Sequence, residues 1–272
     1  MAPQDFKAFG KAVRRAVNLQ DGARLASLMD ASHAPAWAST VPISSWAPTA
    51  CESFEDVAAA QAACAAHLAA GHAIEAYNAL LPSVRQTCDP QRPGLIRILS
   101  FAPLLTPSAS FPLAILFANP SPQVSAFTTL FRKEEDAWCV APLHALVGNV
   151  RNAADAADCA LIASGRKPER LENAGNQLMA CFAAANRPGA NPDKRKATLR
   201  IVNALFRIYF KLNTLRNCKY LIRVVEAKNF LPLSSFATGD VVTYRFFVGR
   251  LAVFDEDFVA ADRDLSFAFR AW

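Results

Sequence analysis

Residues 196–212, KATLRIVNALFRIYFKL, decide the fold class. At about 100° per residue, the polar positions of this stretch fall within an arc of about 80° on one helix. These positions are Lys196, Arg200, Asn203, Arg207 and Lys211. Nearly all the others are apolar, and a helix that is apolar over most of its circumference needs neighbours on two sides. The stretch therefore predicts an inner helix of a stacked helical array.

The C-terminal side continues the helical pattern after a turn at Asn213-Thr214. Three further helices are expected, over 215–227, from a cap at Asp240 or Thr243 to Phe254, and over 258–269. The acidic corner Asp255-Glu256-Asp257 separates the last two, and small residues such as Gly249 let them approach closely. This hairpin is similar to a tetratricopeptide-like helical pair. We expect an all-α protein, an α-solenoid of such hairpins.

The N-terminal side predicts helices too, over 5–17, 23–30, 54–70, 73–81, from 127, over 143–163 and over 170–185, with 33–48 irregular. Composition agrees with this prediction. Hydrophobic residues make up 53% of the chain and charged residues 19%, and only 10 of 272 residues are glycine. Such a composition favours a folded, helix-rich core over a glycine-punctuated β fold.

Residues 84–123 differ from everything around them. Seven of the 17 prolines lie here, without a sustained helical period, and a structureless loop of this length is unusual inside a compact domain. Joining Ser83 directly to Val124 restores a helical pattern, and Val84-Arg85 and Gln123 can be encoded by ordinary splice-site sequences. We interpret the segment as a translated intron. The expected division is 1–83, the insertion 84–123, and 124–272.

Positive charge gathers in the last third of a chain whose formal net charge is +6. Between residues 194 and 228 there are ten basic residues and one acidic residue, a footprint that suits RNA, DNA or an acidic protein. The candidate contact residues, here called the basic stripe, are Lys196, Arg200, Arg207, Lys211, Arg216, Lys219 and Arg223. A solvated helix face and pairing with the acidic corner remain open alternatives. No aromatic residue is expected among the exposed positions, which argues against base stacking.

The sequence gives little support for a catalytic site or a metal-binding site. Cys64, His67 and His72 have no second ligand pair to complete a tetrahedral zinc site. The acidic corner is explained by helix capping, since carboxylates are favourable at a helix N-terminus. No phosphate-binding glycine loop is present, and no Ser or Cys is coupled to a base. We expect no enzyme activity, no cofactor and no metal.

Two patterns bear on the cellular compartment. The apolar stretch 95–118 is interrupted by Arg97 and three prolines, so we expect no membrane span. Seven cysteines without a CxxC pair follow an N-terminus that lacks an apolar leader segment, which is typical of reduced thiols in the cytosol or nucleus.

Three segments carry a likeness to a known family: VNALFRIYFKLNTLRNCKYLIRVVE (202–226), VTYRFFVGRLAVFDEDFVAADRDLSFAF (242–269) and LENAGNQLMACF (171–182). Together they resemble the helical half of the PCI-domain proteins of the TREX-type-two messenger-RNA export complex and their signalosome-associated relatives. Weaker likeness covers most of the chain except 30–60 and 85–123.

The resemblance implies a scaffold subunit in nuclear messenger-RNA export at the nuclear pore, with the cytoplasm as a second compartment. The implied partners are a large export-scaffold subunit and a small acidic proteasome-lid protein, with RNA or DNA as a further ligand. A signalosome-associated or splicing-linked paralogue and a stand-alone nucleic-acid-binding module are the alternatives. Family members continue into a C-terminal winged helix. Because this sequence stops at Trp272 within a helical pattern, we expect a C-terminally truncated chain that lacks it.

Overall fold

The computed structural model describes residues 6–30, 53–72 and 122–271, and every regular element in these ranges is a helix. The α-helices are α1 (Phe6–Asn18), α2 (Gly22–Met29), α3 (Phe54–Ala69), α5 (Pro122–Lys133), α6 (Val140–Ala163), α7 (Arg170–Ala185), α8 (Pro192–Arg195), α9 (Thr198–Lys211), α10 (Leu215–Val225), α11 (Thr238–Phe254) and α12 (Phe258–Arg270). Two 3-10 helices, η5 (Ala137–Cys139) and η6 (Leu233–Ser235), precede α6 and α11. The predictions for 33–48 and 73–81, and for most of 84–123, lie outside the described residues.

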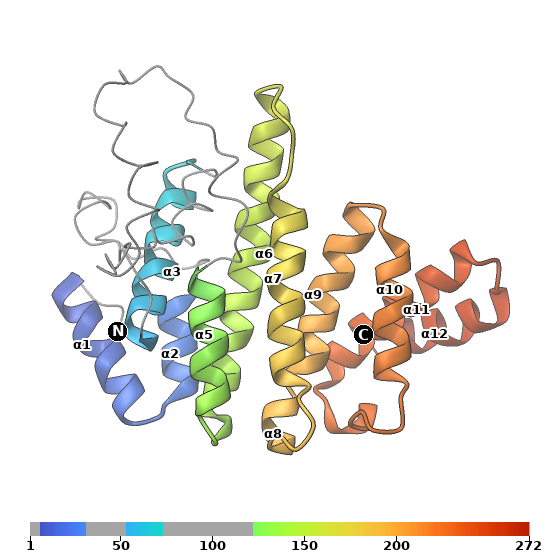
Figure 1. Cartoon of the computed structure of the whole chain (residues 1–272). Helices are drawn as coiled ribbons and strands as arrows, with labels where there is room; N and C mark the ends of the chain where they lie inside the picture. Colours follow the sequence, from blue (N-terminus) through green and yellow to red (C-terminus); the bar gives the residue numbers. More distant parts are fainter. Residues whose placement is uncertain (1–5, 31–52, 73–121, 272) are drawn as a thin grey trace, which may run out of the picture.

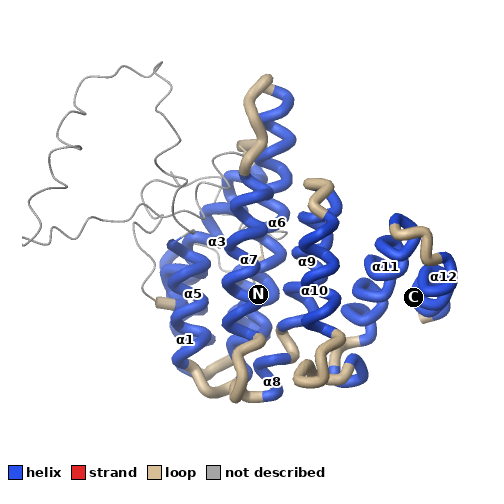
Figure 2. The backbone as a smooth tube through the Cα atoms, turned by 45° about the vertical axis from the view of Figure 1, so that its right-hand side comes forward, coloured by secondary structure: helices blue, strands red, loops and turns tan. Residues whose placement is uncertain are grey.

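The helices stack from α1 at one end to α12 at the other (Figure 1). Helices α2, α6, α9 and α11 touch in succession, while α7 packs on α5, α6 and α9, and α10 packs on α9. The turned view shows the same row of helices (Figure 2). One apolar core runs through the stack from Phe9 in α1 to Leu251 in α11. The predicted all-α, solenoid-like architecture is confirmed.

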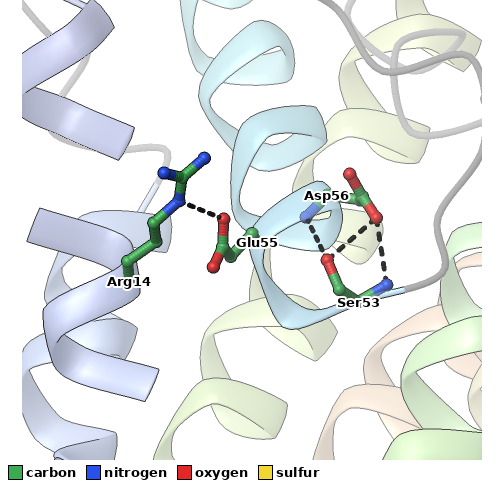
Figure 3. Close-up of polar contacts among 4 residues, drawn as sticks. All are labelled: Arg14, Ser53, Glu55 and Asp56. Atoms are coloured by element: carbon green, nitrogen blue, oxygen red, sulfur yellow. Dashed lines mark hydrogen bonds and ion pairs between the residues drawn. The ribbon is translucent and has the colours of Figure 1, made fainter. Parts of the chain in front are cut away.

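The first helices are fastened by polar contacts at the start of α3 (Figure 3). The Ser53 backbone N–H donates to the Asp56 carboxylate at 3.0 Å, and the Asp56 N–H donates back to the Ser53 hydroxyl at 3.3 Å. This reciprocal capping box satisfies backbone donors that have no partner inside a helix. Beside it, Arg14 of α1 forms an ion pair with Glu55 at 2.9 Å. The pair therefore links α1 to the first turn of α3.

Helix α7 is capped from a distance by Asp158, a buried residue of α6. One oxygen of Asp158 accepts from the backbone N–H groups of Glu169 and Arg170 at 3.1 and 2.9 Å, and the other accepts from Leu171 N–H at 2.9 Å. A carboxylate is favourable at the positive end of a helix. One side chain thus both caps α7 and fixes its position against α6.

Helix α9 is the inner helix that residues 196–212 predict. It contacts α6, α7, α10 and α11. Phe206 at its centre is 1% exposed, and its ring centroid lies 5.9 Å from that of Tyr244 and 5.7 Å from that of Phe247. The apolar faces of α9 are therefore covered on several sides by other helices of the same chain.

Both predicted turns of the C-terminal part are present. Asn213 and Glu256 adopt left-handed backbone conformations with φ of 56° and 58°, which end α9 and α11 sharply. Asp257 then accepts from the Ala260 N–H at 3.0 Å and caps α12. The acidic corner is thus a helix junction in which capping occupies one of the three carboxylates.

The predicted start of α11 is wrong. The helix begins at Thr238 after the extended residue Ala237, not at a cap formed by Asp240 or Thr243. The Thr243 hydroxyl donates to the Gly239 carbonyl inside the helix at 2.8 Å. The Asp240 carboxylate faces Arg200 of α9. Both side chains have other partners, which a single-sequence pattern does not indicate.

Candidate partner-binding face

The basic stripe divides between two faces. Arg200, Arg207 and Lys211 lie on the exposed edge of α9, and Lys196 directly precedes that helix. The other three, Arg216, Lys219 and Arg223, are exposed on α10. The seven residues therefore lie on, or just before, two adjacent helices.

Several members of the basic stripe are already paired within the chain. Lys196 pairs with Asp193 at 2.7 Å, Lys211 with Asp155, and Arg200 with Asp240 at 3.5 Å. On α10, Lys219 pairs with Asp255 of the acidic corner at 2.7 Å. These pairs are about half exposed, so each contributes little to stability and leaves the cation open to exchange of partners. Intramolecular pairing, one of the alternatives open from the sequence, thus accounts for part of the stripe.

Arg200 and Arg207 border a polar groove of about 850 Å³ between α2, α6, α9 and the first turns of α11. Arg151 of α6 lines the same groove. Burial, and then the positive charge of Arg207, lower the pKa of Arg151 from its ordinary value. Two guanidinium groups thus lie near each other, and neither forms an ion pair with any residue that the structure describes. Such a pair of cations favours an anionic ligand.

His144 lies beside Arg200 in the groove and is neutral at physiological pH. Burial, followed by the charge of Arg200, lowers the pKa of His144 to about 4. The arginine Nη1 lies 3.4 Å from His144 Nδ1, and because a guanidinium can only donate, Nδ1 accepts. The groove therefore has arginine charges and an uncharged imidazole above about pH 5.

Asn203 is a correction to the predicted polar arc of α9. Although it shares the arc with Arg200 and Arg207, it is only 5% exposed. Its Nδ2 donates to the backbone carbonyl of Asp240 at 2.8 Å. Asn203 thus fastens the first turn of α11 to α9.

Lys194, part of the basic run, is also buried. Its Nζ donates to the carbonyls of Phe131 and Glu134 at the C-terminal end of α5, and lies 4.4 Å from the centroid of the Phe131 ring. A cation is favourable at this negative helix end. Lys194 is therefore a structural cap and does not contribute to the charge of the surface.

The expectation that no aromatic residue accompanies the exposed cations is wrong. Tyr220 of α10 is 54% exposed. It lies four residues after Arg216 and three before Arg223, so the three side chains share one helix face. The helical spacing of this trio was a usable signal in the sequence, which a count of apolar positions overlooked.

An apolar hollow of about 730 Å³ adjoins the polar groove and shares Arg207 and Thr243 with it. Its other lining residues come from α11 and α12: Val242, Phe246, Phe247, Leu265, Ala268 and Phe269. Phe246 is 42% and Phe269 86% exposed. The helical pattern over 242–269 shows that these residues are apolar, but it does not indicate that they line one hollow.

The cysteine among the zinc ligands considered from the sequence is buried. Cys64 lies in the core within α3, and burial raises its pKa to about 12, so its thiol is unreactive. No group of three or more metal-ligating side chains gathers anywhere in the described ranges. Nor does any described helix combine the length and apolarity that a membrane span requires.

Comparison with known proteins identifies relatives over half of the chain. It is 38% identical to Enhanced ethylene response protein 5 of Arabidopsis thaliana over 146 residues, which are 54% of this chain and 35% of that protein. It is 37% identical to PCI domain-containing protein 2 of Danio rerio over 152 residues, 54% of this chain and 38% of the relative. This chain is homologous to the PCI domain-containing proteins.

A more distant relative of this family is Protein CSN12 homolog of Mycosarcoma maydis, 29% identical over 157 residues, which are 52% of this chain and 35% of that protein. The chain thus spans between 35% and 38% of the length of these three relatives. No family model matches the chain, and no solved structure matches it.

Proposed function

We propose that the chain is a non-catalytic scaffold subunit of a nuclear messenger-RNA export complex that acts at the nuclear pore. The observation that carries the proposal is the 37% identity to PCI domain-containing protein 2 in a chain built of stacked helices. Stacked hairpins present long continuous surfaces, which suit a subunit that holds several partners. The implied location is the nucleus, with the cytoplasm as a second compartment.

The partners in this proposal are a large export-scaffold subunit and a small acidic proteasome-lid-type protein, and the basic stripe contributes to their binding. Charge supports the assignment, because Arg151 and Arg207 border a groove and lack carboxylate partners among the described residues. The pairs of Lys211 and Lys219 are exposed and can exchange for a partner's carboxylates.

Co-expression with these two subunits from the same organism tests the proposal. We expect the three chains to co-elute on size exclusion, with a defined mass by light scattering. Charge reversal of Arg200, Arg207 and Lys211 to Glu should weaken the complex and leave the far-ultraviolet circular dichroism unchanged, since all three side chains lie on the exposed edge of α9. Co-elution with signalosome subunits but not with export subunits would instead favour the signalosome-associated alternative, consistent with the CSN12 homologue among the relatives.

A second candidate function, binding of single-stranded RNA, is favoured by Tyr220. An exposed ring between Arg216 and Arg223 combines a stacking platform with phosphate-binding cations. Base stacking contributes about 1–3 kcal/mol per base. Fluorescence anisotropy with an oligouridylate should therefore show weaker binding for Tyr220→Ala and near wild-type binding for Tyr220→Phe. Equal affinities for all three proteins would rule out stacking on this ring.

A further inference from the structure

The polar groove and the apolar hollow form one amphipathic surface. The two share Arg207 and Thr243, so they are continuous from α6 across α9 and α11 to α12. At the α6 end the surface carries Arg151 and Arg200, and at the α12 end it carries Leu265 and Phe269. A ligand that covers both halves must itself have an apolar side and an anionic side.

The charges of the polar half are not balanced within the described chain. Of the two aspartates that line it, Asp240 is already paired with Arg200. Asp155, the carboxylate that acts on Arg151, is paired with Lys211. Arg151 and Arg207 therefore retain donors for incoming carboxylates, and arginine favours carboxylates through its planar, forked arrangement of N–H groups.

We propose that this surface binds an amphipathic, acidic α-helix of a partner protein. Apolar side chains at helical spacing would fill the hollow against Phe246, Leu265 and Phe269, while carboxylates on the adjoining helix face would reach Arg207 and Arg151. The inference rests on the proposed scaffold function and specifies one contact surface and the chemistry of its occupant.

Two other occupants fit the surface less well. Single-stranded RNA would find few polar partners in the apolar half of the surface, where Phe246, Leu265 and Phe269 lie. A second copy of this chain, with its net charge of +6, would bring further positive charge toward the arginines. A helix with leucines on one side and glutamates on the other meets both halves of the surface.

Anisotropy with a fluorescent peptide of about 18 residues, five helical turns with leucine on one face and glutamate on the other, tests the proposal on the full chain. A peptide of identical composition in scrambled order is the matched control ligand. Arg207→Glu and Phe269→Asp should each weaken binding of the amphipathic peptide by about tenfold or more, and the scrambled peptide should bind about tenfold more weakly than the ordered one. The matched controls Arg187→Glu and Val259→Asp change the same kinds of exposed side chain outside the surface and outside the basic stripe, and should stay within about twofold.

Equal binding of ordered and scrambled peptides, or unchanged binding by both surface variants, would overturn the proposal. An oligouridylate that binds more tightly than the peptide and is lost in Arg207→Glu would assign the surface to RNA, and a dimer lost in Phe269→Asp would assign it to a second copy. The same variants are then assayed for assembly with the export subunits. Assembly that survives while peptide binding fails rejects the surface but keeps the scaffold function, and a wild-type chain that does not assemble rejects the function itself.

Discussion

Helices α9 and α12 are both rich in apolar residues, but their surroundings differ. Helix α9 is enclosed by α6, α7, α10 and α11, whereas α12 packs chiefly against α11. As a result Phe206 of α9 is 1% exposed, and Phe258 and Phe269 of α12 are 67% and 86% exposed. Apolar periodicity thus indicates how much surface a helix must cover, but it does not indicate whether the same chain supplies the cover.

Replacing Phe206, the buried phenylalanine of α9, should have the largest effect on stability. Phe206→Ala removes a ring that packs against Tyr244 and Phe247. The loss of buried surface and the cavity left behind should lower the free energy of unfolding by about 3–5 kcal/mol. Urea denaturation followed by circular dichroism measures the loss. Phe206→Leu, which keeps most of the volume, should lose clearly less, and equal losses would show that the site is not tightly packed.

A fall in pH should also destabilise the folded chain, through His144 of α6, which lies beside Arg200 of α9. Because the pKa of His144 is about 4 in the folded chain and about 6.5 when unfolded, the unfolded state binds the proton first as the pH falls. The stabilisation is complete above about pH 6.5 and is lost progressively toward pH 4, by about 3 kcal/mol at about 1.36 kcal/mol for each unit of difference between the two pKa values. Urea midpoints between pH 4.5 and 7.5 should fall more steeply for the wild type than for His144→Gln. Parallel curves would show that His144 is solvated.

The sequence predicts those parts of the fold that depend on local signals and misses those that depend on distant partners. The helical period and the turn signals at Asn213-Thr214 and Asp255-Glu256-Asp257 predicted the C-terminal helices apart from the start of α11, because these signals are local. Asp158 and Lys194 were missed because their partners lie 11 or more residues away, and Asn203 was misplaced for the same reason. The apolar hollow could not be predicted either, since it depends on how α12 sits against α11.

Removal of Asp158, which caps α7 from α6, should have an intermediate effect on the free energy of unfolding. Asp158→Ala leaves the backbone N–H groups of Glu169, Arg170 and Leu171 without their acceptor. Loss of a helix cap of this kind should cost about 2 kcal/mol. Hydrogen exchange should show the first turn of α7 opening before the rest of that helix. Exchange that rises equally in α12 would argue against a local cap and for global loosening.

A smaller, local effect is expected where the two parts of the terminal hairpin touch. A Cβ at Gly249 of α11 would lie 2.7 Å from Leu265 Cγ of α12. Gly249→Ala should therefore push the helices apart at a cost of about 1–3 kcal/mol. Because α12 packs chiefly on α11, hydrogen exchange should rise in α12 while α9 stays protected. The matched change Gly239→Ala, where no atom lies within 4 Å of the added Cβ, should leave α12 unaffected.

The smallest effect on stability is expected at Phe269, the exposed phenylalanine of α12. Phe269→Ser removes a ring that is 86% exposed, so the free energy of unfolding should change by no more than about 0.5 kcal/mol. Solubility should instead rise, because a contiguous exposed apolar patch favours association. Light scattering against protein concentration and urea denaturation give the two readouts. A loss of stability comparable to that of Phe206→Ala would mean that the Phe269 side chain is covered in solution by the chain itself, and the contrast between α9 and α12 would then fail.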